Sequence, residues 1–207
     1  MTTAAVSVKL AYPSQAEQMA RVIAAAFRDL DASMWLAEGD QRWLDEHYWQ
    51  FFHLAYTQPA MISGRGVVYT TADEMAAAVW LHEEPWHDRT PTGEFLARLA
   101  EITGPHLDRF TQFGEMLDLA HSKVTDTPHD YLGVIGVHPS VWRQGSGRAL
   151  MQAHLTQLDN QGRPAYLEAA DPTKRDIWAK FGFEVVDTIT LPGTEHQLFP
   201  MWRSPKG

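Results

Sequence analysis

Hydrophobic residues follow two different periods along this chain, and these periods predict its elements. Alternating patterns and short apolar runs bounded by turn residues predict strands at 6–11, 67–71, 75–81, 131–137, 165–169, 185–190 and 197–202. Recurrence at helical spacing predicts helices from about residue 15 to 27 and at 41–57, 92–102, 106–123, 145–161 and 173–181. Residues 29–40 break both patterns, so we expect a loop or a short helix there.

Strands and helices alternate only in the second half of the chain. An antiparallel first half joined to a β-α-β crossover predicts an α/β (α+β) fold: a mixed, mostly antiparallel, twisted sheet of six to seven strands with helices on both faces. A length of 207 residues fits a single hydrophobic core, and the chain has no internal repeat or linker-like stretch. We therefore expect one domain spanning residues 1–207.

The net charge of −9 bears on which partners the chain can bind. A nucleic-acid partner would require a basic stripe, so we expect none. An acidic surface favours cationic small molecules, although solubility alone explains the same charge. No stretch resembles a signal peptide or a membrane-spanning helix, which predicts a soluble cytoplasmic protein without a membrane partner.

Cysteine and histidine bear on metal binding and nucleophilic chemistry. The chain has no cysteine, which excludes disulfides, cysteine ligands and a cysteine nucleophile. It has ten histidines, but His-Glu-x-x-His does not occur, and His82 and His87 are too far apart to be adjacent ligands on one helical face. We expect no metal site, and histidines scattered over the surface.

An apolar strand from Tyr131 to Pro139 is followed by a glycine turn, Gly145-Ser146-Gly147, that opens a helix. The first N–H groups of a helix lack partners within it, so such a turn offers backbone donors to a phosphate group. A nucleotide P-loop, a dinucleotide fingerprint and a nucleophile elbow all require spacings that this turn lacks; the second would need a glycine where Leu150 stands. The remaining interpretation is a loop for the diphosphate of CoA.

Several stretches of the chain resemble the GCN5-related N-acetyltransferase (GNAT) superfamily. The most specific part runs from Leu132 to Phe183 and includes Val137-x-Pro139, Gly145-x-Gly147, Ala149-Leu150 and Phe181-Gly182-Phe183. The layout of the remaining chain is similar to that of puromycin N-acetyltransferase-like members. The resemblance implies a sheet whose central pair of parallel strands splays apart, with acetyl-CoA as co-substrate.

The resemblance also assigns residues to acetyl-CoA. It places the diphosphate on Arg143, Gln144, Gly145, Ser146, Gly147 and Arg148, and the pantetheine arm along Ile135, Gly136 and Val137, with the Val137 N–H facing the thioester oxygen. Trp142, Asp171 and Trp178 are the further residues expected at the cofactor. The superfamily usually has Gln or Arg and then Gly where Trp142 and Arg143 stand. We expect Trp142 to pack or to cover the adenine. The loss of the glycine need not prevent binding if Arg143 keeps an ordinary helical or extended backbone and adds positive charge at the phosphates.

Glu168 belongs to the segment Leu167–Ala170, which matches the family strand beside the reacting centre. A partly buried carboxylate there can accept the proton of the amine, directly or through water; the alternative is an exposed or ion-paired glutamate. Trp178 stands where the family usually has the tyrosine that protonates the leaving thiolate, and an indole N–H is a poor acid. That proton then comes from Tyr131 or from solvent, or transfer is slow or absent.

Together these residues predict an acetyl-CoA-dependent N-acetyltransferase that moves an acetyl group, by direct attack, to a primary amine of a small molecule such as an antibiotic or aminonucleoside. The runner-up is a non-catalytic acyl-CoA-binding or sensing module, suggested by Trp142 and Trp178. Candidate acceptor-binding residues are Trp35, Tyr48, Phe52 and Trp86, which could instead be buried framework. The aromatic segment 41–57 indicates core packing, a pocket wall or an oligomer interface, so we expect a monomer or a homodimer.

Overall fold

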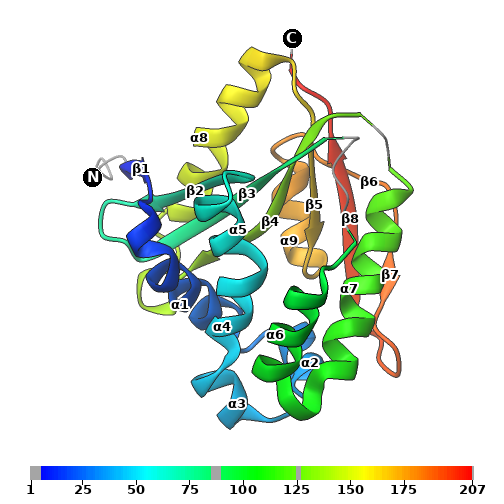
Figure 1. The fold of residues 1–207 in the computed structure, drawn as a ribbon. Helices are drawn as coiled ribbons and strands as arrows, with labels where there is room; N and C mark the ends of the chain where they lie inside the picture. The colour runs from blue at the N-terminus through cyan, green and yellow to red at the C-terminus, as the bar shows by residue number, and fades with distance from the viewer. Residues whose placement is uncertain (1–5, 85–89, 125–126, 207) are drawn as a thin grey trace.

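One mixed sheet organises the chain in this computed structural model, which describes residues 6–84, 90–124 and 127–206 (Figure 1). The described part has eight strands, in the order β1-β2-β3-β4-β5-β8-β6, with β7 also paired to β8. Only β4 and β5 are parallel; the other neighbours are antiparallel. Their bounds are β1 Val8–Leu10, β2 Gly66–Thr71, β3 Ala76–Glu83, β4 His129–Val137, β5 Ala165–Ala169, β6 Glu184–Val185, β7 Ile189–Thr190 and β8 Gln197–Arg203.

The strand expected at 185–190 is divided into β6 and β7, which accounts for eight strands rather than six or seven. Pro200 of β8 explains the division. The Val186 N–H donates to the Pro200 carbonyl (2.9 Å), and the N–H and C=O of a strand residue point to the same side. Because proline has no N–H, the ladder on that side is interrupted at Pro200, between the parts of β8 that pair with β6 and with β7.

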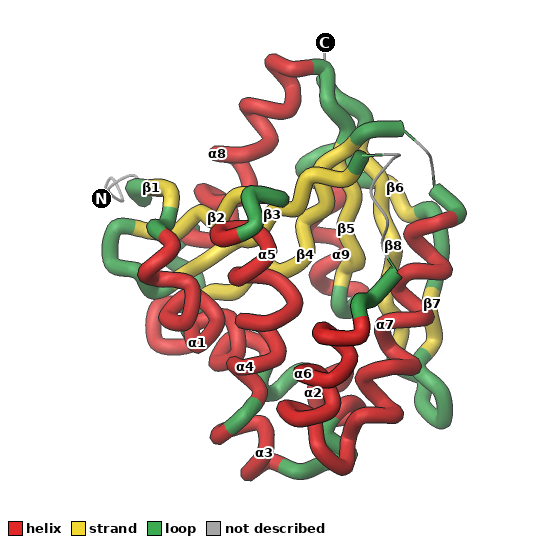
Figure 2. The backbone as a smooth tube through the Cα atoms, in the orientation of Figure 1, coloured by secondary structure: helices red, strands yellow, loops and turns green. Residues whose placement is uncertain are grey.

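Helices cover both faces of the sheet, as predicted (Figure 2). One face carries α1 Ala16–Phe27, α2 Asp31–Leu36, α3 Gln41–Glu46, α4 Tyr48–Phe52, α5 Gln58–Ile62, α6 Gly93–Thr103 and α7 Leu107–Ser122. The other face carries α8 Ser146–Gln161 and α9 Pro172–Ala179. Short turns of 3-10 helix add η1 Pro13–Gln15, η3 Gly104–His106 and η4 Pro139–Val141, and η2 His53–Thr57 is a π-helical turn. No helix within the described ranges is long and apolar enough to cross a membrane.

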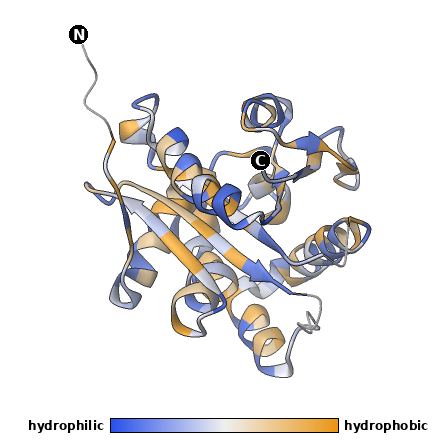
Figure 3. Ribbon diagram, turned by 90° about the horizontal axis from the view of Figure 1, so that it is seen from above, coloured by the Kyte–Doolittle hydropathy of each residue, from blue (hydrophilic) through white to orange (hydrophobic). Residues whose placement is uncertain are grey.

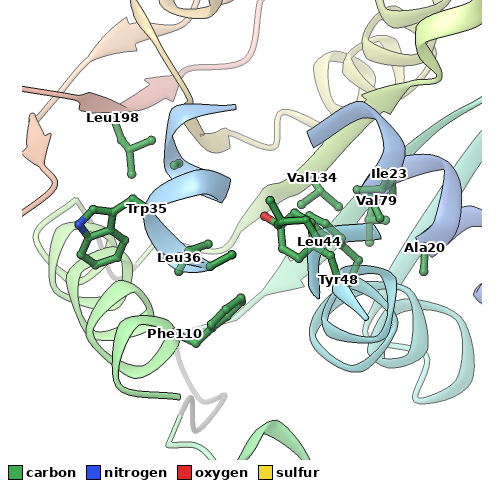
Figure 4. Close-up of a cluster of buried hydrophobic side chains, with 14 of the residues drawn as sticks. Ala20, Ile23, Trp35, Leu36, Leu44, Tyr48, Val79, Phe110, Val134 and Leu198 are labelled. Atoms are coloured by element: carbon green, nitrogen blue, oxygen red, sulfur yellow. The ribbon is translucent and has the colours of Figure 1, made fainter. Parts of the chain in front are cut away.

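Two hydrophobic clusters fill the space between the sheet and these helices. Alternate side chains of a strand point to opposite faces, so Val79 and Val134 join the cluster under α1–α7, whereas Trp80 and Leu132 join the cluster under α8 and α9. Figure 3 shows hydrophobic residues along the strands between the two layers of helices. Figure 4 shows the first cluster, with Val134 from the sheet beside Tyr48 from α4.

The aromatic segment expected to form one helix over 41–57 is instead three short pieces, α3, α4 and η2, and α5 follows directly after η2. His47 leaves the helical conformation, with a φ of −122°, and separates α3 from α4. Further on, Pro59 cannot donate an N–H to the Ala55 carbonyl, and the π-helical turn η2 precedes it. Most aromatic side chains of this segment pack inside the chain, so the structure supports the core-packing interpretation.

The parallel strands β4 and β5 separate after a short paired stretch, which confirms the splay implied by the family resemblance. Their pairing starts at Asp130↔Ala165 and ends at Leu132↔Leu167, although β4 continues to Val137. At the same point the register with β3 shifts, so that Gly133 is an extra residue in β4. A bulge bends and twists a strand, and this bend opens a gap between the second half of β4 and the end of β5.

Candidate active site

Glu168 lies at the base of a pocket on the face of the sheet that α1–α7 cover. Leu167 points into the opposite cluster, so its neighbours Tyr166 and Glu168 point toward this face. The pocket walls come from α2, α4, η2 and α7. Its lining residues are Phe27, Leu30, Ala32, Ser33, Leu36, Tyr48, Phe51, Phe52, Tyr56, Phe113, Leu117, Tyr131, Gly133, Val134, Glu168, Ala170 and Leu198.

The environment of Glu168 favours the protonated carboxyl group. Burial among protein atoms raises the pKa of Glu168 to about 7, and the charge of Asp118 acts in the same direction. Hydrogen bonds from the hydroxyl groups of Tyr131 and Tyr166 stabilise the carboxylate and partly oppose this shift. Its Oε1 atom is shielded from solvent and has no hydrogen-bond partner among the described residues. A group with a pKa near neutrality can both accept and release a proton at physiological pH.

Tyr131 lies beside Glu168 as a neutral phenol. Burial raises the pKa of Tyr131 well above its ordinary value, and the neighbouring Glu168 charge adds to the rise. Tyr56 from η2 hydrogen-bonds with Tyr131, and burial likewise raises the pKa of Tyr56. The structure therefore brings the predicted base, Glu168, together with one of the two predicted proton donors, Tyr131.

The predicted acceptor-binding residues divide into three groups. Tyr48 and Phe52 line the pocket. Trp35 does not line it: its indole N–H donates to the Pro192 carbonyl (3.0 Å), and its ring packs against Phe113, which does line the pocket. Trp86 lies outside the described residues. Trp35 was expected to contact the acceptor. It instead packs behind the pocket wall at Phe113, because its indole N–H and its ring both contact other parts of the fold.

Sequence reasoning missed Tyr56 and Gly133, which line the pocket, and Tyr166, which hydrogen-bonds with Glu168. The spacing of Tyr166 two residues before Glu168 on one strand was a signal that could have placed both on the same face. Gly133 has a steric role, since a Cβ atom there would lie 2.6 Å from Cδ1 of Tyr56. Its lack of a side chain lets the Tyr56 ring close over β4. Tyr56 gave no such signal, because the turn that carries it is irregular.

The glycine turn presents unpaired backbone N–H groups at the start of α8. Gly145 precedes the helix with a φ of 89°, a left-handed conformation that suits glycine. Ala149 is the first residue of the helix whose N–H is bonded internally, to the Gly145 carbonyl (3.0 Å). The N–H groups of Ser146, Gly147 and Arg148 have no acceptor in the described part of the chain. Three free donors at a helix N-terminus form an anion site.

Trp142 and Arg143 are the two residues of this loop that depart from the usual superfamily pattern. Arg143 has a φ of 64°, so its backbone is neither helical nor extended and the condition stated for this residue is not met. Arginine adopts the left-handed conformation that the usual glycine reaches without strain. Trp142 is exposed, and its indole N–H donates to the Val137 carbonyl (2.6 Å). Its side chain therefore folds back onto the end of β4.

The edge of β4 that faces the gap supplies further backbone groups. His138 donates its N–H to Met75 on the β3 side (2.8 Å), so the alternate residues Ile135 and Val137 direct their N–H and C=O groups away from β3 and into the gap. Gly136, also expected at the cofactor, directs its backbone toward β3 instead. A Cβ atom on Gly136 would lie 3.0 Å from atoms of Ile23 and Ala26, so this glycine lets α1 approach the sheet.

Comparison with known proteins agrees with this geometry. Residues 24–183 match the model of the acetyltransferase (GNAT) family. The chain belongs to the GNAT acetyltransferase family. It is accordingly an acetyltransferase enzyme, and its mixed sheet with a splayed parallel pair is the GNAT fold.

Three solved structures of similar fold illustrate the range of this GNAT chain's neighbours. A histone acetyltransferase HPA2 and related acetyltransferase from Corynebacterium glutamicum is 19% identical, with a TM-score of 0.67 over 98% of this chain and 97% of that one. Arylalkylamine N-acetyltransferase 2 from Aedes aegypti is 10% identical, with a TM-score of 0.64 over 97% and 99%. NAA60 from Arabidopsis thaliana, in complex with acetyl-CoA, is 12% identical, with a TM-score of 0.57 over 98% and 100%.

The two remaining GNAT-derived assignments, Asp171 and Trp178, lie in or beside α9. Trp178 is buried in the cluster under α8 and α9, against Phe181, on the opposite face of the sheet from Glu168. The structure thus does not bring Trp178 into the pocket with Glu168 and Tyr131. Asp171 is the N-cap of α9, where its side chain accepts the Lys174 N–H (2.7 Å). A capping role accounts for this carboxylate within the fold.

Several histidines are buried, so the expectation of scattered surface histidines is wrong. His121 and His129 lie with their Nε2 atoms 2.7 Å apart, and His154 Nε2 lies 2.7 Å from a carboxylate oxygen of Asp130. These rings are hydrogen-bonded within the interior, which satisfies their polar atoms. Across the described residues, no group of three or more His, Asp or Glu side chains is arranged to hold a metal ion.

Gly147→Ala tests whether the free N–H groups of α8 bind the diphosphate. The added Cβ would lie 3.6 Å from Cγ2 of Val137, an ordinary contact, so the variant is expected to fold with unchanged or slightly raised stability. The methyl group would cover the donors, and we expect acetyl-CoA affinity, measured by calorimetry, to fall by about tenfold or more. Gly114→Ala in α7, where a Cβ meets nothing within 4 Å, is the matched control. Unchanged affinity in Gly147→Ala would place the diphosphate elsewhere.

Glu168→Gln tests the raised pKa through stability. Because the folded-state pKa of about 7 exceeds the ordinary value of 4.5, folding binds a proton between these values, and stability falls as pH rises through that window. The neutral variant lacks this loss. Its free energy of unfolding is therefore expected to exceed that of the unaltered protein by up to about 3 kcal/mol at pH 8, with the difference shrinking toward pH 4.5.

Chemical denaturation across this pH range measures the difference. Glu184→Gln on β6, where the glutamate is exposed, is the control and is expected to show no such pH-dependent gain. A difference between Glu168→Gln and the unaltered protein that stays constant with pH would contradict the raised pKa.

Proposed function

We propose that this chain transfers the acetyl group of acetyl-CoA to a primary amine of a small molecule, with Glu168 as the general base. The observation that carries the proposal is the position of Glu168. Its carboxyl group, with a pKa raised to about 7 by burial, lies at the base of an apolar pocket and beside the gap between β4 and β5. The pocket can admit an amine from one side, and the gap can admit a thioester from the other.

Acetyl-CoA fits the groups that the fold leaves free. The N–H groups of Ser146, Gly147 and Arg148 would bind its diphosphate, with the exposed side chains of Arg143 and Arg148 adding positive charge. The edge of β4 at Ile135 and Val137 would hold the pantetheine arm by main-chain hydrogen bonds. Because Trp142 already occupies the Val137 carbonyl, Val137 keeps its N–H for the thioester oxygen, where it would stabilise developing negative charge.

The reaction then follows as direct attack. Glu168 in its carboxylate form takes a proton from the ammonium group, which frees the nitrogen lone pair. The nitrogen attacks the thioester carbonyl carbon and forms the C–N bond, and the carbonyl oxygen carries the negative charge of the tetrahedral intermediate. Collapse breaks the C–S bond and releases the CoA thiolate. Once Glu168 has passed on its first proton, its carboxylate accepts the remaining excess proton of the nitrogen, which yields the neutral amide.

Tyr131 is the residue that we propose to protonate the thiolate. It lies against Glu168 and stays a neutral phenol, so it holds a proton at the site at any working pH. Burial makes this phenol a weak acid, and the strongly basic phenolate left after donation would recover the first proton from Glu168, with which Tyr131 is hydrogen-bonded. The runner-up function, a non-catalytic acyl-CoA-binding or sensing module, was suggested by Trp142 in the loop and by Trp178 standing where the family has an acid. A phenol within the pocket removes the need for an acid at Trp178.

The acceptor is proposed to be a small molecule because the pocket is walled by helices of the same chain. The resemblance of the sequence layout to puromycin N-acetyltransferase-like members extends the proposal to aminonucleoside antibiotics, and puromycin is therefore a natural test substrate. The pocket offers aromatic surface to such a compound and a carboxylate to its amino group.

The expected effect of Glu168→Gln on turnover tests the base. The variant should bind acetyl-CoA normally but lose about 10²- to 10⁴-fold in kcat, because the amide cannot accept the proton. In the unaltered protein, kcat/KM should rise with pH through an inflection near 7 and then level off as the carboxylate forms. In the variant, this inflection should disappear.

Stopped-assay rates with acetyl-CoA and a panel of amines, measured from pH 5.5 to 9, supply these values. Glu184→Gln again serves as the exposed control, with rates equal to those of the unaltered protein. Full activity of Glu168→Gln, or an inflection near 7 that survives the substitution, would exclude Glu168 as the base.

A further inference from the structure

The pocket holds very few charged groups, and this restricts what can bind in it. Among the described residues that line the pocket, Glu168 is the only Asp, Glu, Lys, Arg or His. The three lining tyrosines, Tyr48, Tyr56 and Tyr131, are buried and stay neutral because burial raises the pKa of each phenol. A ligand therefore finds one anionic group in these walls and no cationic one.

The other polar groups of the walls already have partners. The Ser33 hydroxyl donates to the Phe27 carbonyl (2.7 Å) and lies 2.9 Å from the Tyr48 hydroxyl. Tyr56 and Tyr131 hydrogen-bond with each other. These pairs leave Oε1 of Glu168 as the lining atom that is buried and lacks a partner among the described residues. A ligand that donates a hydrogen bond would therefore find its acceptor at the Glu168 end of the pocket.

Aromatic rings form much of the remaining surface. Tyr48 and Phe51 stack with ring centroids 6.2 Å apart, and Phe52 meets Tyr48 at 4.6 Å. Phe113 adds a ring from α7. These rings pack against one another, and the apolar surface that they contribute to the pocket favours an aromatic or apolar body. An ammonium group fits the Glu168 end, while a carboxylate or phosphate would be buried without a cation.

We propose that the acceptor is a primary monoamine whose amino group is joined by a short arm to an aromatic or apolar body, without a carboxylate, a phosphate or a second amino group. The inference rests on the proposed acetyl transfer and narrows it. Amino acids are excluded as acceptors because their carboxylate would have no cationic partner in the pocket walls. Polyamines and aminoglycosides are excluded as acceptors because they carry several ammonium groups, whereas the pocket walls supply a single carboxylate.

A panel of four amines separates these classes: tryptamine, tryptophan, spermidine and kanamycin. Each is assayed with acetyl-CoA for amide formation, and binding of each to the protein is measured by calorimetry. Tryptamine is expected to exceed tryptophan in kcat/KM by about 100-fold or more, because the two differ by a carboxylate that would be buried unpaired. Spermidine and kanamycin are expected to react more slowly than tryptamine by a similar factor.

A charge added to the wall gives a second, independent readout. Leu117 of α7 lines the pocket, and Leu117→Arg places a cation there. The ratio of tryptamine to tryptophan kcat/KM is expected to fall by about tenfold or more in this variant, since the guanidinium can pair with the carboxylate. Leu119→Arg is the matched control, because Leu119 lies on the same helix, is 61% exposed and does not line the pocket. The ratio should be unchanged in the control.

The outcomes distinguish this inference from the proposed function. Preferred acetylation of tryptophan, spermidine or kanamycin would keep the acetyltransferase proposal and overturn the monoamine class. Tight binding of tryptamine without turnover of any amine would support the ligand class and overturn the catalytic proposal. Absence of tryptamine binding together with absence of turnover of every amine in the panel would overturn both. Because the panel uses the unaltered protein, its result stands even if Leu117→Arg fails to fold.

Discussion

The short pairing of β4 with β5 is the constraint on which the rest of the site depends. Three residues of parallel ladder end at Leu132↔Leu167, where Gly133 forms a bulge against β3. Beyond this point the edge of β4 is not paired with β5, although the Val137 carbonyl accepts from the Trp142 indole, and Glu168 has a paired neighbour on the β8 side but none on the β4 side. A continuous sheet would have used these groups internally. The separation therefore produces both the edge proposed to bind acetyl-CoA and the position of the proposed base.

The site also costs stability. A glutamate in apolar surroundings is favoured as a neutral group, and ionising it at physiological pH opposes folding. Arg143 in a left-handed conformation adds a smaller backbone cost in the turn beside α8. Both costs fall on residues that would contact the reactants, and the two large hydrophobic clusters on either side of the sheet offset them. Glu168 and Arg143 thus lower the stability of the fold at positions where the proposed function requires them.

The sequence predicted the helices, the strands and the proposed acetyl-CoA site better than the walls of the pocket for the acceptor amine. Strand and helix periods located most elements, and the turn at Gly145–Gly147 indicated a diphosphate site because glycine spacing and a helix start are local features. Glu168 and Tyr131 were predicted through the family resemblance, and the structure brings them together. The acceptor walls depend on long-range packing: Phe113 from α7 and Tyr56 from η2 meet only after folding, and Trp35 and Trp178 are buried elsewhere. The break at Pro200 likewise arises from pairing between distant segments.

A crystal structure of the protein with bound acetyl-CoA tests the central claim most directly. The account requires the diphosphate on the N–H groups of Ser146, Gly147 and Arg148, the pantetheine arm along Ile135 and Val137, and the thioester carbonyl at the Val137 N–H within reach of the Glu168 pocket. Continued separation of β4 and β5 around the bound arm would agree with it. A ligand bound away from this gap, or strands that close together when it binds, would contradict it.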